Sequence, residues 1–184
     1  MSDKKKTALL IIDMINNFKF DNGAVLAERA TDIAQPIYQL KKKMKKSKMP
    51  IIYINDHYDL WQANYEKIAQ KCTNSLSKPI IDLLYPENDD FFLIKPKHSA
   101  FYGTALNTLL YSLNVNTLII TGIAGNICVL FTANDAYMRE YKLFVPNDCL
   151  ASNDIQDNEY ALKMMKNVLK ASDTPSKQLN LINM

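Results

Sequence analysis

The sequence predicts an α/β fold in which a mostly parallel sheet carries helices on both faces, giving a three-layer sandwich. Short runs of consecutive apolar residues alternate along the chain with longer stretches that repeat apolar residues every three or four positions. The short runs are apolar throughout rather than at every second position, which is typical of parallel strands covered on both faces. The length of 184 residues fits a single domain spanning residues 1–184.

The strands of this sheet are expected where the short apolar runs fall. These runs are Ala8–Asp13, Ile51–Asn55, Phe91–Lys95, Thr117–Thr121 and Leu143–Pro146. The end of the chain, Thr174–Met184, is expected either to add an edge strand or to remain a tail.

The segments between these runs have helical spacing. The first, Leu26–Lys48, places its apolar side chains on one face, and Pro36 is expected to kink or divide it. Thr104 is expected to cap the start of a later helix, and Asn153 or Asp154 to cap the last one. The other helical segments are Leu60–Cys72, Asn126–Glu140 and Ile155–Lys170.

Composition excludes several classes of protein. Apolar residues make up 48% of the chain and charged residues 22%, which is typical of a globular domain rather than a disordered chain. The net charge of +3 is too small to indicate nucleic-acid binding. No apolar run approaches the roughly 20 residues of a membrane-spanning helix. The apolar run near the N-terminus is too short for a secretion signal, so we expect a cytoplasmic protein that binds neither nucleic acid nor membrane.

Cysteine and histidine content argues against a disulfide framework and a zinc site. The three cysteines, Cys72, Cys128 and Cys149, are few and odd in number. The two histidines, His57 and His98, and the absence of a Cys-x-x-Cys pair provide no zinc-type ligand set. We therefore expect neither a metal nor another cofactor, although an aspartate-rich oxygen site stays open.

The predicted sheet indicates where a ligand would bind. In open parallel sheets, ligands bind beyond the carboxyl ends of the strands. The polar residues expected at those ends are Asp13, Asn55, Asp56, Lys95, the loop Gly122–Asn126, and Asp148.

Three of these positions carry side chains suited to covalent catalysis. At Asp13, partial desolvation would raise the pKa of the carboxyl group and suit it to act as a base; the alternative is a loop or capping aspartate. Lys95 could lower the pKa of a nearby thiol, or be a surface lysine. Cys128 falls in the first turn of a helix, where the helix dipole favours thiolate, although buried helix cysteines are also common. Together they have the pattern of nucleophile, base and orienting group, whereas His57 and His98 lie elsewhere in the sequence.

Three segments resemble the isochorismatase-like cysteine hydrolases, a superfamily that includes nicotinamidases, carbamoyl-amide hydrolases and isochorismatases. The segments are Leu10–Met14, Lys95–Thr104 and Thr121–Val129. They occur in the order and at spacings compatible with that superfamily, and the resemblance runs from about Ala8 to about Asp148.

The resemblance implies a catalytic triad of Asp13, Lys95 and Cys128. Cys128 would attack the carbon of a small amide, Asp13 would pass the proton to the leaving ammonia, and Lys95 would stabilise the thiolate and orient Asp13. The backbone N–H groups of Ala124 and Cys128 would form an oxyanion hole. A cis peptide bond would join Ile123 and Ala124. A thioester and its hydrolysis by water would follow.

The segment Asn55–Tyr58 departs from the pattern of the nicotinamidases, which carry Asp-x-His with another histidine soon after to hold a metal. Here no histidine follows His57 until His98, so a metal-dependent nicotinamidase is not expected. Isochorismatases proper cleave a vinyl ether and can manage without the thiol, which leaves that reaction, with Asp13 as the acid, as one alternative. A non-catalytic binding module of the same fold is the other.

Other residues near the expected strand ends are assigned to the substrate pocket. They are the aromatic residues Phe18, Trp61 and Tyr102 and the amides Asn17 and Asn126. Each also has a plainer explanation as a core or turn residue.

Two further segments bear on partners. The basic run Lys41–Lys48 is expected to be a solvated helix face near a helix C-terminus, rather than a binding site for nucleic acid or an anionic surface. The resemblance implies a homodimer or homotetramer. The stretch Leu60–Tyr65 is expected to serve as an interface or as a lid.

Overall fold

The computed structural model describes residues 6–181 of the chain. Within these residues, parallel strands pair in the order β3-β2-β1-β4-β5, and β6 also pairs with β4. The strands are β1 (Lys6–Ile12), β2 (Ile51–Asp56), β3 (Phe91–Lys95), β4 (Val115–Ile123), β5 (Lys142–Phe144) and β6 (Leu150–Ala151).

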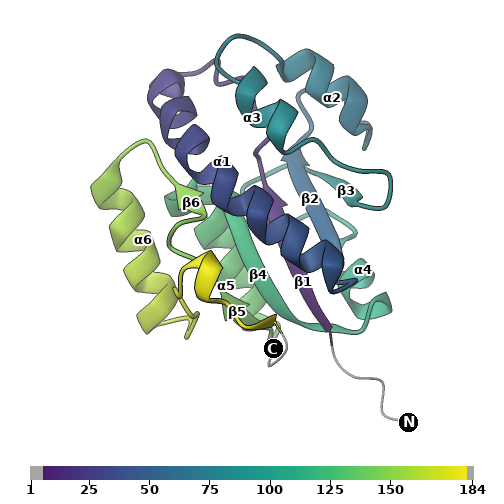
Figure 1. Cartoon of the computed structure of the whole chain (residues 1–184), viewed down its shortest axis with the longest axis vertical. Helices are drawn as coiled ribbons and strands as arrows, with labels where there is room; N and C mark the ends of the chain where they lie inside the picture. The colour runs from purple at the N-terminus through teal and green to yellow at the C-terminus, as the bar shows by residue number, and fades with distance from the viewer. Residues whose placement is uncertain (1–5, 182–184) are drawn as a thin grey trace.

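Helices cover both faces of this sheet, and the predicted three-layer α/β fold is confirmed (Figure 1). Helix α1 crosses one face, and α4 and α5 lie behind the other. The helices are α1 (Gly23–Lys46), α2 (Tyr65–Cys72), α3 (Lys78–Leu83), α4 (Leu106–Ser112), α5 (Leu130–Met138) and α6 (Ile155–Asn167). A π-helical turn, Gly125–Val129, precedes α5, and a short 3-10 turn, Ser176–Gln178, follows α6.

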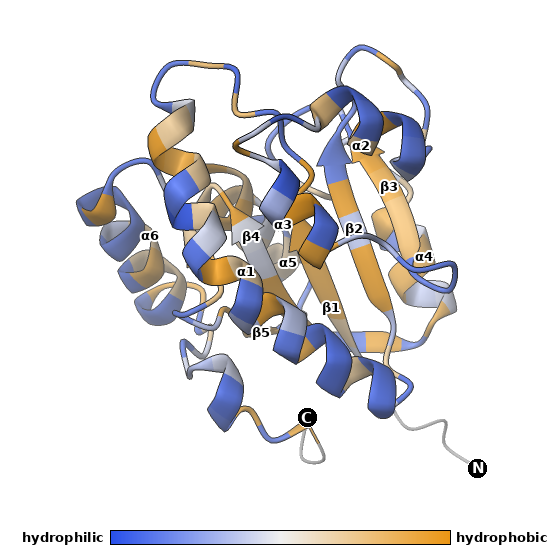
Figure 2. Ribbon diagram, turned by 45° about the horizontal axis from the view of Figure 1, so that its top comes forward, coloured by the Kyte–Doolittle hydropathy of each residue, from blue (hydrophilic) through white to orange (hydrophobic). Residues whose placement is uncertain are grey.

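The central strands divide their side chains between two cores, which explains their continuous apolar sequence. In β1, Leu9 and Ile11 pack with α1, whereas Leu10 and Ile12 pack with the helices on the opposite face. In Figure 2, β1, β2 and β3 are largely orange, whereas the helices carry much of the hydrophilic colour. Alternate residues of a strand point to opposite faces, so a strand buried on both faces needs apolar residues at every position.

All five predicted strands are present, Phe91–Lys95 with the predicted bounds and the other four with different bounds, and two short elements were missed. Strand β6 has two residues and helix α3 has six, so neither is long enough to produce a recognisable period. The predicted helix Leu60–Cys72 begins only at Tyr65, because the side chain of Asn64 accepts a hydrogen bond from the Lys67 N–H at 3.0 Å and caps it there.

Proline does not divide α1, which continues from Gly23 to Lys46 through Pro36. Pro36 removes the N–H that would bond to the carbonyl of Asp32, and Asp32 lies on the exposed side of the helix, where water can replace that donor. Asp154 caps α6 as predicted, since its carboxylate accepts hydrogen bonds from the N–H groups of Gln156 and Asp157.

The end of the chain forms a tail rather than an edge strand as far as residue 181. Part of the predicted segment Thr174–Met184 is the turn Ser176–Gln178. Asp148 holds this turn, because its carboxylate accepts hydrogen bonds from the N–H of Ser176 at 2.8 Å and from its hydroxyl at 2.7 Å. The last residues, 182–184, lie outside the described residues.

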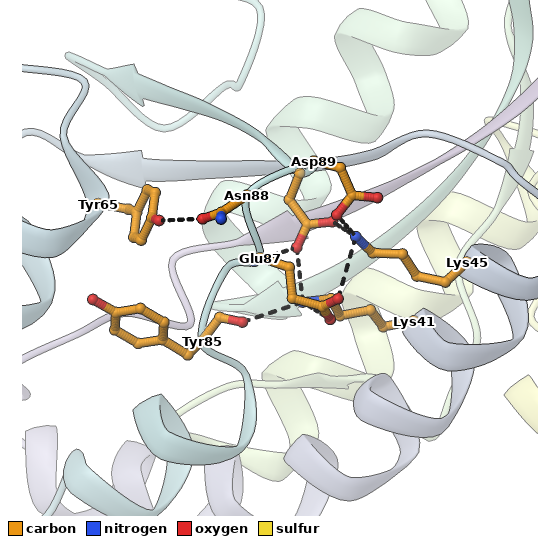
Figure 3. Close-up of polar contacts among 8 residues, drawn as sticks. Lys41, Lys45, Tyr65, Tyr85, Glu87, Asn88 and Asp89 are labelled. Carbon is orange, nitrogen blue, oxygen red and sulfur yellow. Dashed lines mark hydrogen bonds and ion pairs between the residues drawn. The ribbon is translucent and has the colours of Figure 1, made fainter.

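The basic run Lys41–Lys48 is not uniformly solvated, which corrects the prediction. Lys41 is only 2% exposed, and its Nζ lies 3.1 Å from Glu87 Oε1 and 2.8 Å from Asp90 Oδ2. Lys45 Nζ lies 2.7 Å from Asp90 Oδ1. Both lysines extend from α1 toward the loop before β3 (Figure 3). A run of lysines does not reveal which of them face carboxylates from a distant segment.

Across residues 6–181, none of the helices is both long enough and apolar enough to cross a membrane.

Candidate active site

Three side chains from different strands meet at the carboxyl edge of the sheet. Asp13 directly follows β1, Lys95 is the last residue of β3, and Cys128 lies in the turn between β4 and α5. Lys95 Nζ lies 2.8 Å from Asp13 Oδ2 and 3.4 Å from Cys128 Sγ. The ammonium group therefore contacts both partners, and the three residues singled out in the sequence lie in one cluster.

The backbone around Asp13 fixes its carboxylate. The N–H of Asp13 donates to the carbonyl of Ile54 at 3.0 Å, which extends the pairing of β1 with β2 by one residue. Asp13 itself has a φ of 53°, so the chain leaves the strand in the left-handed conformation that aspartate tolerates better than most residues. The backbone N–H of Asp56 donates to Asp13 Oδ1 at 3.0 Å, which leaves Oδ2 for Lys95.

The turn that carries the thiol depends on Gly122, near the end of β4. Gly122 has a φ of +113°, and a Cβ at this position would lie 2.1 Å from the carbonyl oxygen of Ile12. No side chain fits between β4 and β1 here. The peptide bond between Ile123 and Ala124 is cis. The π-helical turn Gly125–Val129 then leads directly into α5.

Two buried hydroxyl groups hold this turn in place. The Thr132 hydroxyl donates to the carbonyl of Cys128 at 2.7 Å and accepts from the N–H of Ala100 at 2.9 Å. It therefore ties the thiol-bearing turn to the loop that follows β3. On the other side, the Ser152 hydroxyl accepts from the N–H of Asn126 at 3.0 Å.

The Cys128 thiol is not the thiolate that its position at a helix start predicted. Burial raises the pKa of the thiol, the negative charge of Asp13 raises it further, and Lys95 lowers it only in part, giving a pKa of about 12. Burial also lowers the pKa of Lys95, but the charge of Asp13 and the hydrogen bonds with Asp13 and Cys128 act in the opposite direction, and the pKa lies above its usual value. At neutral pH the cluster holds a protonated thiol beside a lysine–aspartate ion pair.

A cavity of about 520 Å³ opens beside the cluster, and Asp13, Lys95 and Cys128 all lie in its wall. This volume is within the range of small-molecule sites. The remaining wall residues are Asn16, Asn17, Lys19, Phe20, Asp56, Tyr58, Pro96, Lys97 and His98.

Of the residues predicted to contact substrate, Asn17 lies in this wall, and several other wall residues were missed. The missed residues follow strand ends closely in sequence: Phe20 is seven residues after Asp13, and His98 is three residues after Lys95. That proximity is a signal that sequence reasoning could have used. His98 was expected to lie away from the cluster, but it lies in the wall of the same cavity as Cys128.

Four other predicted pocket residues lie outside the wall of this cavity. Phe18 is 3% exposed and packs in the core with α1. Trp61 and Tyr102 are 64% and 62% exposed, and Asn126 Nδ2 donates to Asp157 Oδ2 at 3.4 Å. Their place near strand ends was correct, but sequence does not show to which side of a loop a side chain turns.

Two further residues predicted at strand ends serve the fold. Asn55 is fully buried, and its Nδ2 donates to the carbonyl of Ile15 at 2.6 Å. Asp148 holds the C-terminal turn through Ser176. Neither lies in the wall of the cavity.

In the part of the chain that the structure describes, no group of three His, Cys, Asp or Glu side chains is arranged to hold a metal ion. His57 instead organises its own loop. Its Nδ1 accepts a hydrogen bond from the N–H of Asp59 at 3.0 Å, and its ring stacks on Trp61 with 3.9 Å between centroids.

Comparison with known proteins agrees with this architecture. The family model described as the isochorismatase domain matches residues 7–175. The chain is 60% identical over 176 residues to the uncharacterized isochorismatase family protein YaaI of Bacillus subtilis, covering 96% of this chain and 97% of that protein. A shorter match, 47% identical over 62 residues, links 34% of this chain to 25% of the ureidoacrylate amidohydrolase RutB of Methylorubrum extorquens.

The crystal structure of the nicotinamidase SaPncA from Staphylococcus aureus superposes with a TM-score of 0.72 at 25% identity, over 92% of this chain and 98% of that one. The fold of the two proteins is therefore the same along nearly the whole chain. From the family match and the long, highly identical relative, the chain belongs to the isochorismatase family of hydrolases.

Proposed function

We propose that this protein is a cysteine hydrolase that cleaves the C–N bond of a small carboxamide or ureido compound through a thioester. The observation that carries the proposal is the position of Lys95 Nζ, which contacts both the Asp13 carboxylate and the Cys128 sulfur beside a cavity. A base, an ammonium group and a nucleophile that share one open space form the arrangement that acyl transfer requires. The names of two similar proteins, a nicotinamidase and a ureidoacrylate amidohydrolase, denote amide cleavage.

The first half of the reaction forms the thioester. As Cys128 Sγ attacks the carbonyl carbon, its proton passes to Asp13, an S–C bond forms, and the carbonyl π electrons move to oxygen. Lys95 stabilises the negative charge that develops on sulfur, and the backbone N–H groups of Ala124 and Cys128 hold the oxyanion. When the oxyanion collapses, the C–N bond breaks and Asp13 returns the proton to nitrogen, so that ammonia or an amine leaves.

The second half restores the enzyme. Water attacks the thioester carbon while Asp13 takes one of its protons, and the C–S bond then breaks. Sulfur regains a proton from Asp13, and the acid product leaves. The raised pKa of Cys128 fits this order of steps, because a thiol that keeps its proton at neutral pH needs a neighbouring base to remove that proton.

The test is ammonia release from a panel of small amides and ureides, measured for the wild type and for Cys128→Ala. We expect turnover to fall by at least about 10⁴-fold in Cys128→Ala, because the nucleophile is lost. The melting temperature should change little. Cys72→Ala is the matched control, since it removes a thiol that lies outside the cavity wall; its activity per folded molecule should be retained.

The same variant separates the competing functions. A vinyl ether hydrolase would use Asp13 as an acid and would release pyruvate from isochorismate with or without Cys128. A non-catalytic module would turn over none of the panel. Hydroxylamine added during turnover should divert the acyl group to a hydroxamate if a thioester forms, and full turnover by Cys128→Ala would exclude the proposed mechanism.

A further inference from the structure

The wall of the cavity beside Cys128 includes two lysines that have no role in the proposed chemistry. Lys19, on the loop after β1, and Lys97, on the loop after β3, both lie in its wall and are exposed. Within residues 6–181, neither lysine forms an ion pair with a carboxylate, whereas Lys95 pairs with Asp13. Unpaired lysines also occur elsewhere on the surface, but these two share their cavity with the proposed nucleophile.

The charges of the wall leave the cavity positive. Lys95 and Asp13 compensate each other at 2.8 Å. The remaining carboxylate of the wall is that of Asp56, whose Oδ1 accepts a hydrogen bond from the N–H of Tyr58 at 2.8 Å. Outside the Lys95–Asp13 pair, the wall therefore carries two lysines and one carboxylate, and a cleft lined by an excess of one sign attracts ligands of the other sign.

We propose that the substrate carries a carboxylate in addition to its scissile amide, and that Lys19 and Lys97 bind that carboxylate. This inference rests on the proposed function and specifies its substrate class as small ureido acids and amide acids. Lys95 and Cys128 lie deeper than the two exposed lysines, so the amide carbon reaches the sulfur while the carboxylate stays near the mouth of the cavity. The two lysines come from loops on either side of β2 and therefore reach the ligand from different strands.

The experiment compares acids with neutral compounds of the same shape. N-carbamoylglycine is paired with isobutylurea, and succinamate with 4-methylpentanamide, because an isopropyl group replaces the carboxylate with little change in outline. We expect kcat/KM to be at least about tenfold higher for the acid of at least one pair, the effect of a charge-assisted contact. Raising the salt from about 0.05 M to about 0.5 M should reduce that preference.

Substitution assigns the preference to the two lysines. Lys19→Gln and Lys97→Gln should each lower kcat/KM for the acid by about tenfold, mainly through KM, and change that for the neutral partner by less than about twofold. Lys163→Gln is the matched control, because Lys163 is exposed on α6 and outside the cavity wall; both compounds should react as with the wild type.

A binding measurement separates failure of this inference from failure of the proposed function. Calorimetry on Cys128→Ala should detect an acid from the panel and not its neutral partner. Selective acid binding without turnover by the wild type would contradict the proposed function but support the carboxylate site. Equal turnover of both members of each pair, or loss of both activities together in the lysine variants, would overturn the carboxylate site alone. Absence of any acid binding and of any acid turnover would also overturn it.

Discussion

Two lysines are buried against carboxylates at opposite ends of β3. At the start of β3, Asp90 precedes the first strand residue, Phe91, and pairs at 2.8 Å with Lys41 of α1, which is 2% exposed. At the far end of β3, Lys95 is 3% exposed and pairs with Asp13, also at 2.8 Å. By burial and by ion-pair distance, the two lysines cannot be told apart.

Their other neighbours differ. Lys41 Nζ also contacts the carbonyl of Tyr85 at 3.2 Å and lies 5.2 Å from the centre of the Tyr53 ring, and it is absent from the wall of the large cavity. Lys95 Nζ has the Cys128 sulfur at 3.4 Å and borders that cavity. A buried ion pair is therefore a weak sign of function by itself. A nucleophile within contact and space for a substrate are what distinguish the second cluster.

The largest expected difference between the two clusters is in catalysis. Lys95→Met removes the ammonium group that stabilises charge on sulfur, and we expect turnover of the identified amide to fall by about 10³-fold. The measurement is ammonia release per folded molecule, with near-UV circular dichroism to count folded protein. Lys41→Met provides the comparison and should keep its activity per folded molecule. Retention of more than about a tenth of the activity in Lys95→Met would remove Lys95 from the proposed mechanism.

The next effect is on stability and concerns Lys41. Lys41→Met leaves the buried Asp90 with Lys45 as its one remaining lysine partner among the described residues, and we expect the free energy of unfolding to fall by about 3 kcal/mol, the lower end for a broken buried pair. Urea denaturation measures this change. Lys42→Met is the matched control, because Lys42 is the exposed neighbour on α1 and should change stability by less than about 0.5 kcal/mol. An equal, small effect in both variants would mean that the Lys41 cluster contributes little.

The sequence was sufficient to predict the cluster of Asp13, Lys95 and Cys128, because parallel strands bring their carboxyl ends to one edge. Each of these residues ends or follows a strand that is recognisable from its continuous apolar run. The positions of the strand ends do not place Phe18, since whether a loop side chain turns inward depends on tertiary packing. They do not distinguish Lys41 from the solvated lysines around it either, because the partners of Lys41 come from a segment more than 40 residues away.

The protonation of Cys128 was also beyond sequence reasoning. A cysteine in a first helical turn predicts a thiolate, but burial and a neighbouring carboxylate act in the opposite direction. Those two effects depend on the depth of the thiol and on its distance from the carboxylate, which become known only when the strands are assembled.

The smallest expected effect tests that protonation through the rate of alkylation. Since a thiol ionises above its pKa, Cys128 should react slowly with iodoacetamide at pH 7, and its rate should still be rising at pH 9. Asp13→Asn removes a charge that raises the pKa of Cys128. We expect that pKa to fall by about one unit and alkylation at pH 8 to rise by about fourfold, because a less basic thiolate is also less nucleophilic. Peptide mass spectrometry resolves Cys128 from Cys72 and Cys149, which are fully buried and should label equally in both proteins.

A wild-type rate that levels off below pH 8, or a rate that falls in Asp13→Asn, would show that the effect of Lys95 on the pKa of Cys128 outweighs the effects of burial and Asp13. The cluster would then hold a thiolate before substrate binds, and Asp13 would act only on the leaving group and on water.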